Sequence, residues 1–278
     1  MMETAASHPV PWWLRAYLLL GAFQGFGLGI TGFLLPEGIQ IPYQMSPLNA
    51  RFIGALYLAA GIGVLLSAFA RHREDTRVFV IGFGVATGLI MIVTILHWPE
   101  FMADPLPHRA SWIASYVVAP LFALLIVPAA GLIPATSARP HRLSALLITE
   151  CVVLCLLGVL LLGFPEAAAA VWPWALPPVL GQLYGCFFLA LSLGAFLAAR
   201  EPSSTAVRNY ALTSLALALL VLLASALHVP RFKPEPVSWL WFGSFAVGAG
   251  VFAAALLWHV RERGLASTRP RQDESPRE

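Results

Sequence analysis

Eight runs of apolar residues, each long enough to cross a bilayer, constrain the fold of this chain more than any other feature. A helix needs about 20 predominantly apolar residues to span the hydrocarbon core. The whole chain is 59% hydrophobic and only 11% charged, which is far outside the range of soluble domains. We place the eight runs near residues 12–35, 50–70, 77–97, 111–134, 143–164, 177–199, 206–228 and 237–259.

The length and pattern of these runs predict helices and exclude the strands of a membrane barrel. A barrel strand needs only about 10 residues, and every second side chain in it is polar. The runs here are longer and show no such alternation. The sequence therefore predicts an all-α, polytopic membrane protein with about eight transmembrane helices.

The apolar pattern occurs twice along the chain, and the matching residues keep the same order. The first copy contains Gly54-Ala55-Leu56-Tyr57, Ala68-Phe69, Arg71, Arg77, His97-x-Pro99-x-Phe101 and Ser111-Trp112. The second copy contains Gly181-Gln182-Leu183-Tyr184, Ala195-Phe196, Arg200, Arg208, His228-x-Pro230-x-Phe232 and Ser238-Trp239. Such a fixed order is typical of a tandem duplication. We expect a four-helix repeat at residues 1–138, a second at 139–260, and a disordered cytoplasmic tail at 261–278.

The basic residues predict the orientation of the chain, because Lys and Arg in short loops are held on the cytoplasmic side. One predicted face carries Arg15, Arg71, Arg73, Arg77, Arg139, Arg142, Arg200, Arg208 and the tail from Arg261, against only Arg51, Arg109, Arg231 and Lys233 on the other. Both termini are therefore predicted to be cytoplasmic, in the plasma (inner) membrane. Because each repeat has an even number of spans, both repeats enter from the same side and are parallel.

The second span of the first half carries Arg51-x-x-Gly54-x-x-Tyr57, after a Pro-ended first span and an outer loop. On these residues each half resembles the DoxX-like group of small four-helix bacterial membrane proteins. The second half departs from the pattern, since Pro178 stands in the place of Arg51. The resemblance implies a four-helix unit and implies no catalytic residue.

Glycines at four-residue spacing line one face of several spans and let another backbone approach closely. They are Gly21, Gly25 and Gly29 in the first span, Gly84 and Gly88 in the third, and Gly181 and Gly185 in the sixth. Intramolecular helix packing is the favoured interpretation. A homo-oligomer interface and a groove for a flat ligand are the alternatives.

His97 and His228 are a matched pair of candidate site residues at the outer ends of two spans, where Pro99 and Pro230 stop the helices. One interpretation is a helix-end side chain that satisfies free carbonyls. Another is symmetric ligation of haem, a metal or a quinone oxygen, since imidazole is the commonest metal ligand. A polar ligand site is the third.

Glu150 is the only acid well inside a predicted span, where an unpaired carboxylate is costly. We expect it to pair with Arg208, Asn209 or Arg15. The alternative is a proton-relay or ligand site.

Four further polar side chains lie inside predicted spans: Gln24, Gln182, Tyr57 and Tyr184. Such groups usually form hydrogen bonds between helices. Together they are candidates to line a small polar pocket near the outer half of the bundle.

The sequence contains no nucleophile elbow, P-loop, dinucleotide fingerprint or zinc-binding helix, so we expect no enzyme and no metal site. The formal charge of +3 follows from the loop arginines and does not indicate nucleic-acid binding. The favoured hypothesis is binding or transport of a small apolar or amphipathic ligand between the two halves. Two alternatives stay open. One is a haem- or quinone-binding redox protein that uses His97 and His228, and the other is an accessory subunit that binds a membrane partner or a second copy through its glycine faces.

Overall fold

The structure is a computed structural model that describes residues 8–39, 41–43, 45–103, 105–132 and 141–267. The described residues form ten α-helices, two short 3-10 turns and no β-strand. The helices are α1 (Trp12–Leu34), α2 (Pro47–Ala68), α3 (Arg77–Leu96), α4 (Trp98–Met102), α5 (Leu106–Ala129), α6 (Ser144–Gly163), α7 (Pro165–Val171), α8 (Pro178–Arg200), α9 (Ser204–Ala226) and α10 (Pro236–Ser267). The turns are η1 (Arg73–Thr76) and η2 (Val229–Arg231).

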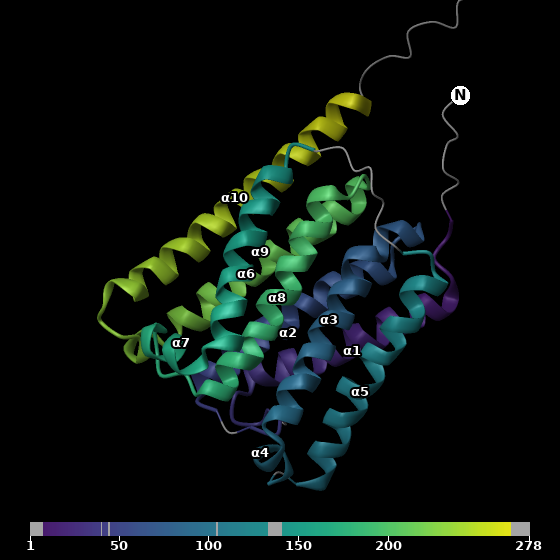
Figure 1. Ribbon diagram of the computed structural model, residues 1–278. Coiled ribbons are helices and arrows are strands. Elements are labelled where there is room, and N and C mark those ends of the chain that lie inside the picture. The colour runs from purple at the N-terminus through teal and green to yellow at the C-terminus, as the bar shows by residue number, and fades with distance from the viewer. Residues whose placement is uncertain (1–7, 40, 44, 104, 133–140, 268–278) are drawn as a thin grey trace, which may run out of the picture.

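Eight of these helices are long and apolar enough to cross a membrane, which confirms the predicted all-α, multi-pass membrane protein. They are α1, α2, α3, α5, α6, α8, α9 and α10 (Figure 1). Some boundaries differ from the predicted ones. For example, α2 begins at Pro47 because the Ser46 side chain caps it, accepting a hydrogen bond from the backbone of Asn49 at 3.3 Å.

The segment predicted as a disordered tail begins as helix, because α10 continues through residues 261–267. Residues 268–278 lie outside the described part of the chain, as do residues 133–140 around the predicted boundary between the two repeats. The start of α1 and the end of α10 lie at the same end of the bundle, with the connections from α2 to α3 and from α8 to α9 (Figure 1). We call this end of the bundle the terminal end. The opposite end carries α4, α7 and η2, and we call it the far end.

The two halves of the chain interlock instead of standing side by side. In each half the first helix packs along the second, α1 on α2 and α6 on α8, and the third packs along the fourth, α3 on α5 and α9 on α10. The two pairs of one half barely meet each other. Instead α2 packs against α9 and α3 against α8, so that each pair is completed by a pair from the other half (Figure 1).

Close helix contacts occur at equivalent places in the two halves, but with a register different from the predicted one. A Cβ added to Gly54 of α2 would lie 2.5 Å from the backbone nitrogen of Phe33 in α1. In the second half the residue that meets the backbone of Leu162 in this way is Gly185, at 3.1 Å, and not Gly181, which the sequence match had paired with Gly54. The match of the second helices is therefore shifted by one helical turn.

A tryptophan near the start of each fourth helix shows a smaller shift, from Trp239 to Trp241 in the second half. The indole of Trp112 donates to Thr94 Oγ1 at 2.9 Å, and the indole of Trp241 donates to Ser225 Oγ at 3.0 Å. The sequence match had paired Trp112 with Trp239, whose side chain is 77% exposed, whereas those of Trp112 and Trp241 are 3% and 8% exposed. The duplication itself stays a prediction. If it occurred, these contacts show which residues of the two halves correspond.

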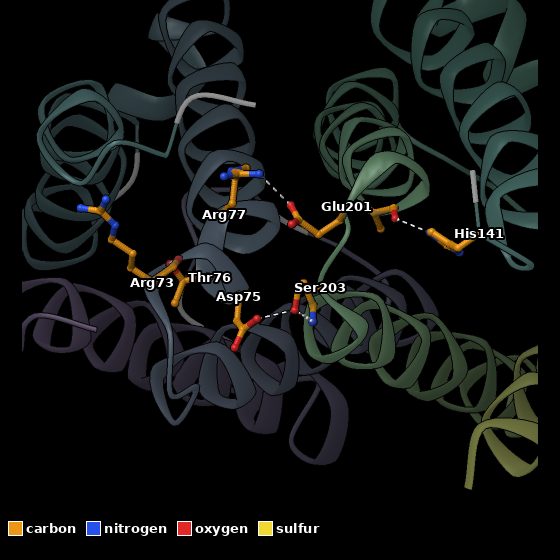
Figure 2. Close-up of polar contacts among 9 residues, drawn as sticks. Arg73, Asp75, Thr76, Arg77, His141, Glu201 and Ser203 are labelled. Atoms are coloured by element: carbon orange, nitrogen blue, oxygen red, sulfur yellow. Dashed lines mark hydrogen bonds and ion pairs between the residues drawn. The ribbon is translucent and has the colours of Figure 1, made fainter. Parts of the chain in front are cut away.

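Polar contacts at the terminal end tie the two halves together (Figure 2). Arg77, at the start of α3, donates to Glu201 in the connection from α8 to α9 at 3.0 Å. The hydroxyl of Ser203 in the same connection donates to Asp75 in η1. A third contact lies within the second half, where His141, just before α6, bonds to the carbonyl oxygen of Ala198 at 2.9 Å. The contacts of Arg77 and Asp75 therefore hold the two halves together at this end.

Candidate functional site

A cavity of about 80 Å³ lies in the middle of the bundle, between helices of both halves. Its walls come from α1, α2, α3 and α5 of the first half and from α8 and α9 of the second, and they are almost entirely apolar. Gly82 of α3 leaves part of the wall open, since a Cβ added there would meet only the carbonyl oxygen of Ala190 at 3.8 Å. The cavity is therefore suited to an apolar occupant.

Three polar side chains from three helices meet in the wall of this cavity. Tyr57 of α2 and Tyr116 of α5 are hydrogen-bonded through their hydroxyls, and both are buried. Gln24 of α1 lines the same cavity. All three lie near the middle of their helices. A hydroxyl has one proton and two acceptor sites, so the pair retains capacity to bind an oxygen of a ligand.

An apolar groove between α1 and α5 reaches Gln24, one of these three polar side chains. It encloses about 570 Å³ and shares Gly21, Gln24 and Phe83 with the central cavity. Its outer walls include Leu20 and Phe122, which are exposed on the surface that faces lipid in a membrane. The groove and the cavity are therefore adjacent, with Gln24 in the wall of both.

Glycine contacts hold α1 and α5 against other helices, and the Tyr17 hydroxyl of α1 donates to the carbonyl oxygen of Ala119 in α5 at 3.1 Å in the wall of the groove. A Cβ added to Gly25 of α1 would lie 2.9 Å from the Cα of Gly61, so α1 is drawn tightly onto α2. On the other side of the groove, a Cβ added to Gly84 of α3 would lie 2.5 Å from the Cβ of Ala123 in α5. These glycine faces are used for packing within the chain, as the favoured interpretation of the sequence predicted.

The matched histidines lie in two separate contacts, each with a helix of the other half. His97, at the end of α3, is bonded through Nε2 to Gln182 Oε1 of α8 at 2.5 Å. His228, at the end of α9, is bonded through Nε2 to Nη1 of Arg51 in α2 at 2.5 Å. Arg51 and Gln182 occupy equivalent places, since each lies three residues before the glycine that meets the preceding helix, Gly54 or Gly185. Both histidines therefore act as links between the halves in this structure, and haem ligation through Nε2 would require both links to break.

The electrostatics of His228 favour its neutral form. Partial burial lowers the pKa of His228, and the nearby positive charges of Arg51 and Arg231 lower it further. Because the Arg51 guanidinium has only donors, Nε2 of His228 is the acceptor of their hydrogen bond. This places the ring proton on Nδ1.

Tyr184 and Gln182 do not line the cavity with Gln24 and Tyr57, and each has a partner elsewhere. The hydroxyl of Tyr184 donates to Asn49 Oδ1 at 3.0 Å, and the indole of Trp174 donates to the same atom at 2.7 Å. Asn49 thereby fastens the connection from α7 to α8 onto α2. Tyr184 has a packing role in this far-end cluster.

Glu150 of α6 is bonded to a residue that the sequence did not suggest. Its Oε1 accepts a hydrogen bond from Ser214 of α9 at 2.9 Å, and its Oε2 is buried with no partner among the described residues. The predicted partners Arg208 and Asn209 are instead bonded to each other at 3.3 Å. Their helix, α9, presents Ser214 further along, at the depth of Glu150.

Tyr116 is the site residue that the sequence analysis did not single out. It lies in the middle of an apolar run, and its partner Tyr57 comes from a different helix pair. The one available signal was an aromatic ladder, since Trp112 and Tyr116 are one turn apart, with ring centroids separated by 4.4 Å.

Comparison with known proteins found no match to the chain among family models, curated proteins or solved structures. The function is therefore inferred from the geometry of the cavity and its polar side chains.

Proposed function

We propose that this protein binds a small apolar or amphipathic molecule that enters from the bilayer between α1 and α5. The apolar part of the ligand occupies the groove and the central cavity. An oxygen of the ligand, such as a hydroxyl or carbonyl group, forms hydrogen bonds with Tyr116, Tyr57 and Gln24. The observation that carries the proposal is that a lipid-facing groove and a cavity with three polar side chains at mid-depth share Gly21, Gln24 and Phe83 in their walls.

The energetics favour selection by the polar group of the ligand. Moving an apolar chain from lipid into an apolar groove gains little, because lipid tails are as apolar as the groove. An oxygen left without a partner in the bilayer core costs several kcal/mol, whereas a hydrogen bond between groups inside the membrane contributes about 0.6–2 kcal/mol. We therefore propose that the hydroxyl pair of Tyr57 and Tyr116 distinguishes the ligand from the surrounding lipid.

Filling the cavity tests this proposal. Gly82→Leu adds a side chain that projects into the cavity from an open position on α3. Gly27→Leu is the matched control, because a Cβ at Gly27 of α1 meets nothing within 4 Å and Gly27 does not line the cavity. The measurement is organic extraction of the purified full chain, followed by mass spectrometry of what co-purifies.

We expect one apolar, oxygen-containing molecule near stoichiometric amount in the wild type and in Gly27→Leu, and a loss of that molecule in Gly82→Leu. Tyr116→Phe should lower its amount while leaving the fold intact, since only a hydroxyl is removed. Equal amounts of bulk phospholipid in all four proteins, with no other molecule, would refute the proposal.

The orientation in the membrane belongs to the same proposal. The loop arginines support a terminal end that faces the cytoplasm. His72 at the terminal end and Ala103 at the far end are both exposed. In a background without other cysteines, we expect His72→Cys to react with an impermeant thiol reagent only in inverted membranes, and Ala103→Cys only in intact cells. The opposite result for either variant would reverse the orientation.

A further inference from the structure

Each half has an equivalent arginine at the terminal end, and the two arginines have different partners. In the first half, Arg77 forms a buried ion pair with Glu201, at 3.0 Å, and the two side chains are 11% and 2% exposed. The carboxylate comes from the connection between α8 and α9, in the other half of the chain (Figure 2). The charge of Arg77 is therefore neutralised across the interface.

Arg208 of α9 is the counterpart of Arg77, since the two lie at the same distance in sequence before the histidines that end α3 and α9. Ala70 lies as many residues before His97 as Glu201 lies before His228, so Ala70 is the counterpart of Glu201, and its side chain carries no charge. No carboxylate in the described part of the chain lies within ion-pair distance of Arg208. Its guanidinium donates to Asn209 at 3.3 Å, and its Nε is buried without a partner.

A pocket lies where the missing carboxylate would be. It encloses about 560 Å³, and its walls include Ala70, Arg208, Arg71 and His72. Asp75 also lines it, and the carboxylate of that residue accepts the hydroxyl of Ser203. Two arginines against one aspartate leave the pocket with a net positive charge.

We propose that this pocket binds the phosphate of an anionic phospholipid headgroup, which takes the place that Glu201 fills in the other half. A guanidinium matches the oxygens of a phosphate with parallel hydrogen bonds, and basic pockets between transmembrane helices bind anionic headgroups. Leu66 and Phe69 provide an apolar wall beside the arginines, and Phe69 is 70% exposed. Such a wall suits the acyl chains of a lipid, and a free phosphate would leave it uncovered.

Thermal unfolding of the full chain in detergent tests the proposal, with phosphatidylglycerol, phosphatidylcholine or inorganic phosphate as the added probe. We expect phosphatidylglycerol to raise the unfolding temperature more than phosphatidylcholine does. Arg208→Gln should weaken the apparent affinity for phosphatidylglycerol by roughly 10- to 100-fold, as the loss of charge-assisted hydrogen bonds predicts. Arg200→Gln is the control, because Arg200 lies at the same end, over the ring of Phe196, and does not line the pocket.

Ala70→Glu provides a second variant that does not remove a contact. The new carboxylate recreates the missing partner of Arg208, so this protein should unfold at a higher temperature than the wild type without lipid and respond little to phosphatidylglycerol. An undiminished response to phosphatidylglycerol in both Arg208→Gln and Ala70→Glu would overturn the site. A response to inorganic phosphate in place of phosphatidylglycerol would overturn the lipid as its occupant.

Discussion

Removing one partner of the buried ion pair between Arg77 and Glu201 should destabilise the protein far more than removing both. In Glu201→Leu the guanidinium of Arg77, 11% exposed, is left without its carboxylate. Breaking a buried pair in this way costs about 3–5 kcal/mol. At about 2–4 °C per kcal/mol for a chain of this size, the unfolding temperature should fall by roughly 6–20 °C.

The double variant Arg77→Leu/Glu201→Leu should be more stable than either single variant. The pair is incompletely satisfied, since Arg77 Nε and Glu201 Oε1 are buried without partners in the described structure. Burial raises the pKa of Glu201, and the attraction of Arg77 only partly offsets this effect, so desolvation is the larger cost. Replacement of such a pair by apolar side chains is often neutral or stabilising by about 1–4 kcal/mol.

Circular dichroism melts in one detergent measure all three variants. Glu74→Gln is the control, because its pair with Arg73 at 3.3 Å is about one-third exposed and such pairs contribute about 0–1 kcal/mol. The reasoning would be refuted if Glu201→Leu melted within 2 °C of Glu74→Gln, or if the double variant lost as much stability as the two single variants together.

Two further predictions concern the polar contacts of Glu150 and His228. Glu150→Gln keeps an acceptor for Ser214 and should melt near the wild type, whereas Glu150→Leu should lose about 1–3 kcal/mol; equal melting of the two variants in detergent would exclude a buried partner. The pKa of His228 is lowered from 6.5 by burial, Arg51 and Arg231, so below about pH 6.5 the unfolded chain binds a proton that folded His228 does not. The stability of the protein should therefore fall as the pH drops from 6.5 through the pKa of folded His228. Thermal melts between pH 7.5 and pH 5 should show a smaller loss of stability in His228→Gln than in the wild type. An equal loss in both proteins would assign the acid sensitivity to other groups.

The number of membrane-spanning helices and the packing role of the glycines could be predicted from the sequence, because span length and glycine spacing are local properties. The grouping of polar residues could not, because it depends on how the halves interlock. Tyr57 and Tyr184 share a sequence pattern, yet the one-turn shift of α8 puts Tyr184 beside Asn49 and leaves Tyr57 with Tyr116. The partner of Glu150 was missed for a similar reason. The depth of Glu150 in the bundle is set by the packing of α6 on α8, and no sequence spacing relates Glu150 to Ser214.

Photolabelling tests the central claim most directly, since it locates an apolar molecule inside the bundle. The probe is a 16-carbon fatty alcohol that carries a diazirine near its hydroxyl, added to the full chain in nanodiscs. We expect label on α2, α3 and α5 around Tyr57, Gly82 and Tyr116, and we expect excess unlabelled alcohol to displace it. Gly82→Leu should lose this label and Gly27→Leu should keep it. Label confined to lipid-facing side chains such as those of α6 and α10, with no displacement by competitor, would contradict the proposed binding site.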